Sequence, residues 1–307
     1  MKRLPLIGLL VAAMGAAATA VGITAAWPRA GGEPREPRDS LLAHAGVLLY
    51  PAADSVRPPR AMLVFFGNDI GFWAPHRALA WKLSRENIAV VGVDLRRALR
   101  ALPPSGVARE HALRLRISRI IARARGELGA QCSAILVGGH SLGAEIAVWY
   151  AQGTAEITGV LAMSPGARSH LEITISDLAN INPTGPESFA VADAMSQVPP
   201  HVRIAIVRAS KDRYRAADSL LLARGGERTA RFTVPLAGHS LKSGPLTYLQ
   251  VSRALSWLCG DQRCGSAWLG AASSRLGTCD SQIQSSCFDV RRNLEVRRQA
   301  REDKGVV

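Results

Sequence analysis

The sequence has no internal repeat, no phosphate-binding loop and no dinucleotide-binding fingerprint. Without a repeat at a fixed period, solenoid and propeller architectures are not expected. Without a Walker loop or a glycine fingerprint between a strand and a helix, no nucleotide site is expected either. Histidines and carboxylates form no tight cluster at metal-ligand spacing, so we predict chemistry that needs neither a metal nor another cofactor.

Acidic residues are scarce in the chain. Its 307 residues include 24 Asp and Glu against 38 Lys and Arg, which gives a formal net charge of +14 at pH 7. Such an excess indicates affinity for a polyanion, either phospholipid head groups or nucleic acid, or simply a solvated basic surface. Charge alone does not choose between these interpretations, and the rest of the composition is that of an ordinary globular protein.

Cysteines are few, and four of the five crowd the C-terminal segment. Cys132 stands apart at the start of a predicted strand and is expected to be a small buried hydrophobe. An even set in an oxidising compartment favours disulfides, and four cysteines allow three pairings. Zinc is the alternative, but C-x4-C followed by C-x7-C is not a usual ligand spacing. We expect disulfides between sequence neighbours among Cys259, Cys264, Cys279 and Cys287.

The N-terminus reads as an export signal. Lys2 and Arg3 precede an uncharged run from Leu4 to Trp27, and Ala18–Ala20 offers a small-x-small cleavage site. This pattern is typical of a secretory signal peptide. The run is also long enough to span a bilayer as an uncleaved anchor. In either case we predict a periplasmic body, soluble after cleavage or anchored to the inner membrane by residues 4–27.

The chain divides into segments of different composition. Residues 1–27 are the signal peptide or anchor, and residues 28–42, rich in Pro, Gly and charge, are predicted to be a linker. A single domain is expected over residues 43–258, with the irregular stretch 164–200 as a cap insertion. Residues 259–307 form a basic, cysteine-containing appendage.

Within the domain, short apolar runs alternate with longer amphipathic patterns, which predicts an α/β protein with a mainly parallel sheet and helices on both faces. Strands are expected over Val47–Tyr50, Ala61–Phe66, Ile88–Asp94, Ala134–Gly138, Gly159–Met163, Arg203–Arg208 and Arg231–Pro235. Helices are expected over Pro75–Arg85, residues 108–128, Ala144–Gln152, Ala216–Arg224 and Leu246–Leu258.

One turn carries a catalytic signature. Gly139–Gly143 matches G-x-S-x-G, with an apolar strand directly before it and an apolar helix directly after it. That context is the one in which this motif presents a nucleophilic serine. Small residues two positions either side allow strand and helix to approach. We therefore predict Ser141 as the nucleophile, the alternative being an ordinary glycine-rich turn.

The base must follow the serine in the chain, because the triad order in this architecture is serine, acid, histidine. That order leaves His170, His201 and His239. His239 follows the last predicted strand, at the sheet edge where ligands bind in open parallel sheets. His170 lies in the irregular insertion and His201 precedes a strand, so His239 is the predicted base, the alternative being a surface loop histidine.

The acid should follow the preceding strand. Asp212 lies there and is predicted to orient the imidazole; its alternative role is to cap the next helix. Asp218 is the second candidate, although it falls inside a helical pattern. For the oxyanion hole, we predict the backbone N–H groups of Leu142 and of Asn68, which lies in a glycine-rich loop after an earlier strand. The alternative for that loop is a plain glycine turn.

Four passages of the sequence carry a resemblance to a known family. They are the glycine-containing loop Phe65–Trp73, the strand Val90–Asp94, the turn Gly139–Ala144 and the irregular passage Leu171–Leu178. Together they resemble the AcvB/VirJ family of bacterial virulence proteins, a periplasmic branch of the α/β-hydrolases, in which the last passage looks like a strand after the sixth core strand. The likeness covers roughly residues 45–258.

This resemblance implies an α/β-hydrolase fold and hydrolysis of the lysyl ester of phosphatidylglycerol at the inner membrane. Ser141 would attack the ester, His239 would transfer the protons, and the Asp212 carboxylate would orient His239. An anionic membrane surface is then the expected partner, with no nucleic acid. A cationic lysyl group would need a carboxylate nearby, and Asp69, Glu145 and Glu172 are the candidates.

Two other functions stay open. A general carboxylesterase, lipase or thioesterase would use the same triad on a different ester. A non-catalytic periplasmic protein associated with virulence or secretion would need no triad.

Overall fold

The structure is a computed structural model that describes residues 34–260, except 105, 132, 175–176, 178–180, 182, 186 and 243. The predicted export signal lies outside the described residues, as do the appendage beyond Gly260 and every cysteine except Cys259. The predicted disulfides therefore stay predictions. In the described part of the chain, no helix combines the length and hydrophobicity that crossing a membrane requires.

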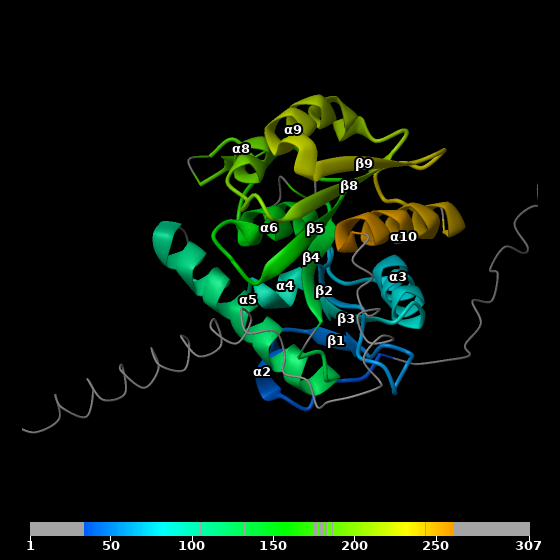
Figure 1. The fold of residues 1–307 in the computed structure, drawn as a ribbon. Coiled ribbons are helices and arrows are strands. Elements are labelled where there is room, and N and C mark those ends of the chain that lie inside the picture. Colours follow the sequence, from blue (N-terminus) through cyan, green and yellow to red (C-terminus); the bar gives the residue numbers. More distant parts are fainter. Residues whose placement is uncertain are drawn as a thin grey trace, which may run out of the picture.

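A seven-stranded sheet forms the centre of the described residues, in the order β1-β3-β2-β4-β5-β8-β9 (Figure 1). Only the edge strand β1 is antiparallel to its neighbour. The predicted α/β class is thus confirmed, with strand ends within two residues of those expected. The strands are β1 Val47–Tyr50, β2 Ala61–Phe66, β3 Ile88–Val93, β4 Ala134–His140, β5 Ile157–Met163, β8 Arg203–Ala209 and β9 Thr229–Val234.

Helices cover both faces of the sheet. The longer ones are α3 Ala74–Arg85, α5 Gly106–Leu128, α6 Leu142–Ala151, α9 Asp218–Gly225 and α10 Pro245–Cys259. Shorter ones are α2 Ser40–His44, α4 Leu95–Ala98, α8 Val191–Ser196 and the 3-10 turns Arg213–Ala217 and Gly226–Arg228. Figure 1 shows α3 and α10 together on one side of the sheet, with α5 and α6 on the other.

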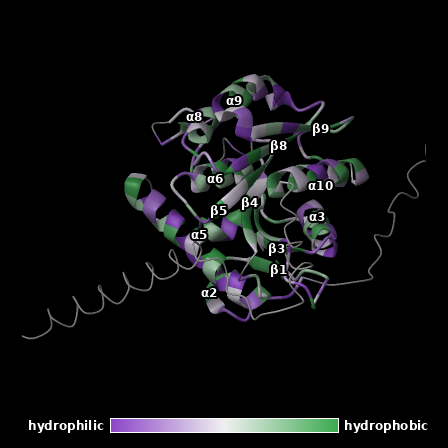
Figure 2. Cartoon of the chain, viewed as in Figure 1, coloured by the Kyte–Doolittle hydropathy of each residue, from purple (hydrophilic) through white to green (hydrophobic). Residues whose placement is uncertain are grey.

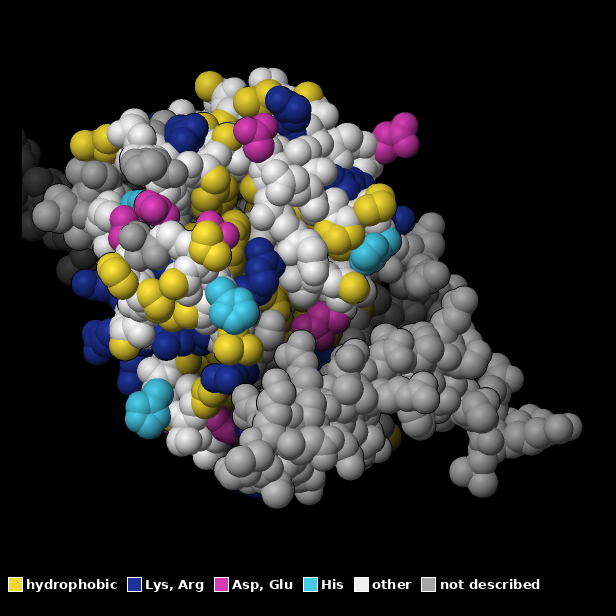
Figure 3. Space-filling view, turned by 90° about the vertical axis from the view of Figure 1, so that its left-hand side faces the viewer, with side chains coloured by type: hydrophobic (Ala, Val, Ile, Leu, Met, Phe, Trp, Pro, Cys, Tyr) yellow, Lys and Arg dark blue, Asp and Glu magenta, His cyan; other side chains and the backbone are white. Residues whose placement is uncertain are grey.

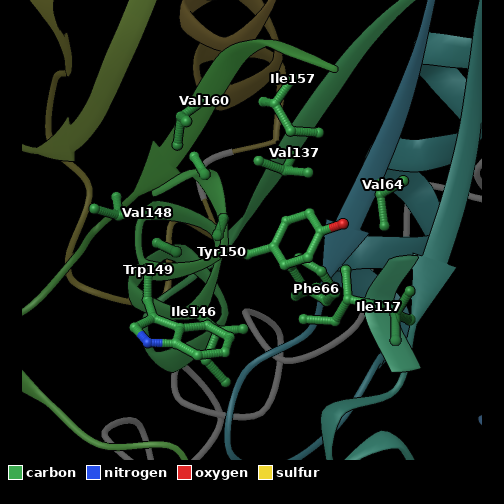
Figure 4. Packing of buried hydrophobic residues seen from close by; sticks show 14 of the residues in the cluster. Val64, Phe66, Ile117, Val137, Ile146, Val148, Trp149, Tyr150, Ile157 and Val160 are labelled. Carbon is green, nitrogen blue, oxygen red and sulfur yellow. The ribbon is translucent and has the colours of Figure 1, made fainter. Parts of the chain in front are cut away.

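Alternation along the strands divides the core in two. In β2, Leu63 and Phe65 pack toward α3 and α10, whereas Val64 and Phe66 pack toward α5 and α6. Figure 4 shows the second cluster, with Tyr150 among the strand side chains. All six residues of β2 are buried, which explains why the run contains no polar residue. Figure 2 shows the same concentration of hydrophobic residues in the central strands.

Part of the predicted linker belongs to the fold. Helix α2 begins at Ser40, and the backbone of Arg35 pairs with that of Leu49. The Glu127 carboxylate accepts hydrogen bonds from the backbone N–H groups of Arg38 and Asp39, at 3.1 and 2.8 Å. Composition alone could not reveal this, because the stabilising partner lies on α5, far along the chain.

The insertion 164–200 contains a two-stranded hairpin, β6 Arg168–Ser169 and β7 Phe189–Ala190, followed by α8. The resemblance of Leu171–Leu178 to a strand is not confirmed, since residues 171–174 and 177, the described part, lie outside any strand. There, Asp177 accepts hydrogen bonds from the backbone N–H and the hydroxyl of Thr174. This local turn replaces extended backbone.

Candidate active site

The nucleophile turn joins β4 to α6 in a strained conformation. Ser141 has φ 54° and ψ −122°, a region that L-residues rarely occupy. Its N–H donates to the carbonyl of Met163, at 2.9 Å. A Cβ added to Gly143 would lie 2.2 Å from the Gly67 oxygen, and one added to Gly139 would lie 2.4 Å from the carbonyl carbon of Gly143. Only glycine therefore allows this turn to pack so closely.

The three predicted triad residues come together at the carboxyl edge of the sheet. His239 Nε2 lies 3.1 Å from Ser141 Oγ. His239 Nδ1 lies 3.1 Å from Asp212 Oδ1. Both distances are within hydrogen-bond reach, as proton transfer from a serine through an oriented imidazole requires.

The triad acid is also bound by a buried arginine that the sequence reading missed. Arg208 Nη1 donates to Asp212 Oδ2 at 2.8 Å, and the backbone N–H of Tyr214 donates to Oδ1 at 3.0 Å. Burial alone would raise the pKa of Asp212, but the hydrogen bonds from His239 and Arg208 outweigh it and hold that pKa well below its usual range. Asp212 thus stays ionised, and it also caps the following turn, so both predicted roles coexist.

Arg208 connects three segments of the chain next to the triad, through Asp212, Asp218 and Pro165. It is only 1% exposed. Its Nε donates to Asp218 Oδ1 at 2.9 Å, and its Nη2 donates to the Pro165 carbonyl at 2.7 Å. Asp218, the second candidate acid, is therefore a partner of Arg208 rather than of His239. The one sequence signal was an arginine directly after the apolar run Ile204–Val207 of β8.

Two buried histidines support the loop after β9 that carries His239. This loop, residues 235–241, is called the catalytic loop below. His140 Nε2 lies 2.9 Å from the His239 carbonyl, and His76 Nε2 lies 3.2 Å from His140 Nδ1. Since a carbonyl only accepts, His140 donates through Nε2 and accepts from His76 at Nδ1. Burial lowers the pKa of His140 to about 4 and that of His76 to about 3. Both rings are therefore neutral at pH 7.

The predicted oxyanion loop lies against the nucleophile turn. The Gly67 carbonyl packs on Gly143, and Asn68 is buried, with its carbonyl accepting from the N–H of Gly71 at 2.9 Å. Leu142 starts α6, where backbone N–H groups are free of intrahelical partners. These contacts place both predicted loops at one corner of the site, and the donor roles of Asn68 and Leu142 stay predictions.

A small cleft of about 40 Å³ lies at Ser141, and its charged lining residues are the carboxylates Asp69, Glu145 and Asp177 and one basic residue, Arg168. Burial raises the pKa of Glu145, which accepts a hydrogen bond from the Gly166 N–H at 2.7 Å. Burial also raises the pKa of Asp69. The cleft, which part of the insertion closes, therefore concentrates carboxylates beside the nucleophile; below, it is called the acidic cleft.

Three sequence candidates lie elsewhere. Glu172 does not reach the acidic cleft but lines a separate cavity, with its Oε1 3.7 Å from His170 Nδ1. His170 Nε2 lies 2.9 Å from each carboxylate oxygen of Asp177, away from the triad. His201 is exposed and begins the approach to β8. The spacing could not position Glu172, because it lies in an insertion without regular periodicity.

No protein-family model matches the chain, and no curated protein sequence matches it. Solved structures do match. The esterase domain of a Rhodothermus marinus protein is 13% identical, with 71% of this chain and 93% of that chain covered and a TM-score of 0.50. MenH from S. aureus is 11% identical, with 69% and 98% covered and a TM-score of 0.50. A Pyrococcus furiosus esterase is 15% identical, with 66% and 84% covered and a TM-score of 0.50.

At such identities the likeness shows the fold and nothing finer. The mostly parallel sheet, the helices on both faces and these neighbours together show an α/β-hydrolase fold. On that fold the chain carries a strained serine, a histidine and an ionised aspartate within hydrogen-bond reach of one another. Fold and triad are those of a serine hydrolase.

Proposed function

We propose that the protein is an exported serine esterase whose substrate is the aminoacyl, most specifically lysyl, ester of phosphatidylglycerol. The observation that carries the esterase assignment is the unbroken chain of contacts from Ser141 through His239 to Asp212, at 3.1 Å each. A non-catalytic binding protein would have no need of this alignment.

The reaction follows from these contacts. His239 takes the proton of Ser141 as Oγ attacks the ester carbonyl, and backbone N–H groups stabilise the oxyanion. The protonated ring then gives its proton to the leaving alcohol, which departs and leaves an acyl-serine. Water attacks this ester with His239 again as base, releasing the acid and restoring the serine.

The acidic cleft supports a cationic acyl group. Asp69 and Glu145 line the same space as Ser141, and burial raises the pKa of both, so an ammonium group bound there would stabilise their ionised forms. The resemblance to the AcvB/VirJ family points to the same ester.

The overall charge supports a lipid substrate. Figure 3 shows Lys and Arg side chains among hydrophobic ones on one face of the molecule. With a net charge of +14, the chain is suited to an anionic bilayer, where each well-placed basic residue contributes about 1 kcal/mol.

The test supplies vesicles that contain lysyl-phosphatidylglycerol and measures the free lysine that ester hydrolysis releases. We expect release by the native chain and none by Ser141→Ala, with a fluorophosphonate labelling only the native serine. Labelling without lysine release, together with cleavage of simple short-chain esters, would instead establish a general carboxylesterase. Absence of both labelling and hydrolysis would favour the non-catalytic alternative.

A further inference from the structure

A second, larger cavity lies between α3 and α10, on the sheet face opposite α6. Its volume is about 640 Å³, and its apolar walls include Trp73, Leu79, Met163 and Leu241. Among the described residues, the two spaces have no lining residue in common. We call it the helical cavity; its size suits an alkyl chain rather than a few water molecules.

The helical cavity lies next to the catalytic loop. His140, which lines it, donates to the carbonyl of His239. Ser240, the residue after the catalytic base, also lines it, as does Met163, whose carbonyl accepts from the Ser141 N–H. A molecule in this cavity therefore lies next to the residues that hold the triad.

Its charge is opposite to that of the acidic cleft. Lys242, which is exposed, lies with its Nζ 5.5 Å from the centroid of Trp73 at the end nearest the catalytic loop. Lys82 lies 5.0 Å from the ring of Tyr248. Among the described residues that line the helical cavity there is no Asp or Glu.

From this polarity we infer that the helical cavity binds a fatty acyl chain of the lipid leaving group, with Lys242 beside its phosphate. The inference rests on the proposed function. An aminoacyl phosphatidylglycerol has a cationic amine on one side of the scissile ester and a phosphate with acyl chains on the other. The acidic cleft receives the first part, and the apolar, lysine-bearing cavity receives the second.

Filling the cavity tests the inference. Ala78 is half-buried on α3 and lines the helical cavity. We expect Ala78→Trp to lower kcat/KM on lysyl-phosphatidylglycerol at least ten-fold more than on a water-soluble lysine ester. Lys242→Gln should lower the ratio of kcat/KM on lysyl-phosphatidylglycerol to kcat/KM on the water-soluble ester about three-fold, because Lys242 meets only the phosphate.

The matched control is Ala112→Trp. Ala112 is likewise half-buried on a helix and lines a cavity of about 560 Å³ between α2, α4 and α5, away from the triad. We expect this variant to keep the native ratio. Equal losses on both esters in Ala78→Trp, or the same change in Ala112→Trp, would overturn the inference.

A binding measurement separates this inference from the proposed function. In Ser141→Ala, phosphatidylglycerol with brominated acyl chains should quench tryptophan fluorescence, and Trp73→Phe should remove most of the quenching. Quenching without lysine release by the native chain would refute the proposed ester while supporting the cavity as a lipid site. Lysine release without quenching at Trp73 would refute the cavity and leave the esterase in place.

Discussion

The two spaces beside the catalytic loop differ in size and in charge. The acidic cleft at Ser141 is about 40 Å³ with carboxylates in its wall, whereas the helical cavity is about 640 Å³ and bears Lys82 and Lys242. His239 lies beside both spaces. Its ring is within hydrogen-bond reach of Ser141, and its carbonyl accepts a hydrogen bond from His140. The comparison teaches that two spaces of different polarity flank one triad, which is the arrangement that the proposed ester, with ammonium groups on one side and a phosphate on the other, would require.

The largest effect should come from removing the nucleophile that both spaces share. Ser141→Ala is expected to lower kcat by about 10⁴-fold or more on every ester, charged or neutral, because it removes the hydroxyl that forms the acyl-enzyme. Steady-state hydrolysis measures this, with circular dichroism as the folding control. Substantial residual turnover would mean that the two spaces flank some other reactive group.

The next effect concerns Arg208, the positioning residue behind the acid. Arg208→Met should destabilise the fold by about 3–5 kcal/mol, because the buried Asp218 loses its partner at 2.7 Å and keeps only the more distant, exposed Arg231 at 3.6 Å. In the double variant with Asp218→Asn, much of that stability should return. Urea denaturation measures both.

A pH profile distinguishes positioning from a merely structural role. Removing the positive charge of Arg208 leaves Asp212 more negative toward the imidazole, so the acid limb of kcat/KM in the double variant should move to higher pH. Asp218→Asn alone, which keeps Arg208 on Asp212, serves as the control. An unmoved limb would assign Arg208 to folding alone.

The neutral histidine pair makes stability depend on pH. Because burial depresses the pKa values of His140 and His76 to about 4 and about 3, the unfolded chain binds protons below pH 6.5 that the folded chain does not. Unfolding free energy should therefore fall as pH drops from about 6.5 toward 4, by about 1.4 kcal/mol per pH unit for each histidine. The conservative His76→Gln should reduce this slope by about half; an unchanged slope would contradict the neutral pair.

The smallest effect sharpens the contrast between the two spaces. Asp69→Asn is expected to lower kcat/KM about ten-fold on a lysine ester but little on the matching acetyl ester, because it removes one partner of the ammonium. Glu187→Gln, on the insertion but outside the acidic cleft, is the control. Equal losses on the two esters would remove the argument for a cationic acyl group.

Much of the fold could be predicted because the buried strands are continuous apolar runs, such as Ala61–Phe66 and Ile88–Val93. The triad followed from a glycine-flanked serine and a fixed chain order, which left His239 at the correct edge of the sheet. Both features are local in sequence or set by topology, and neither depends on the packing of particular side chains.

What could not be predicted depends on contacts between distant or irregular segments. Helix α2 was missed because its support comes from Glu127, 88 residues after Asp39. In the sequence, Arg208 is only the last residue of a predicted strand. Its role depends on Asp212 and Asp218, the two carboxylate partners that the fold brings next to it. Glu172 was wrongly expected near the nucleophile because the insertion has no period from which a side-chain direction follows.

The most direct test is to trap the covalent intermediate. The native chain is mixed with lysyl-phosphatidylglycerol vesicles, quenched in acid within milliseconds, digested and examined by mass spectrometry. The account predicts one lysyl group, in ester linkage, on the peptide that contains Ser141. Lysine release that continues with no adduct on that peptide, or an adduct on another residue, would contradict it.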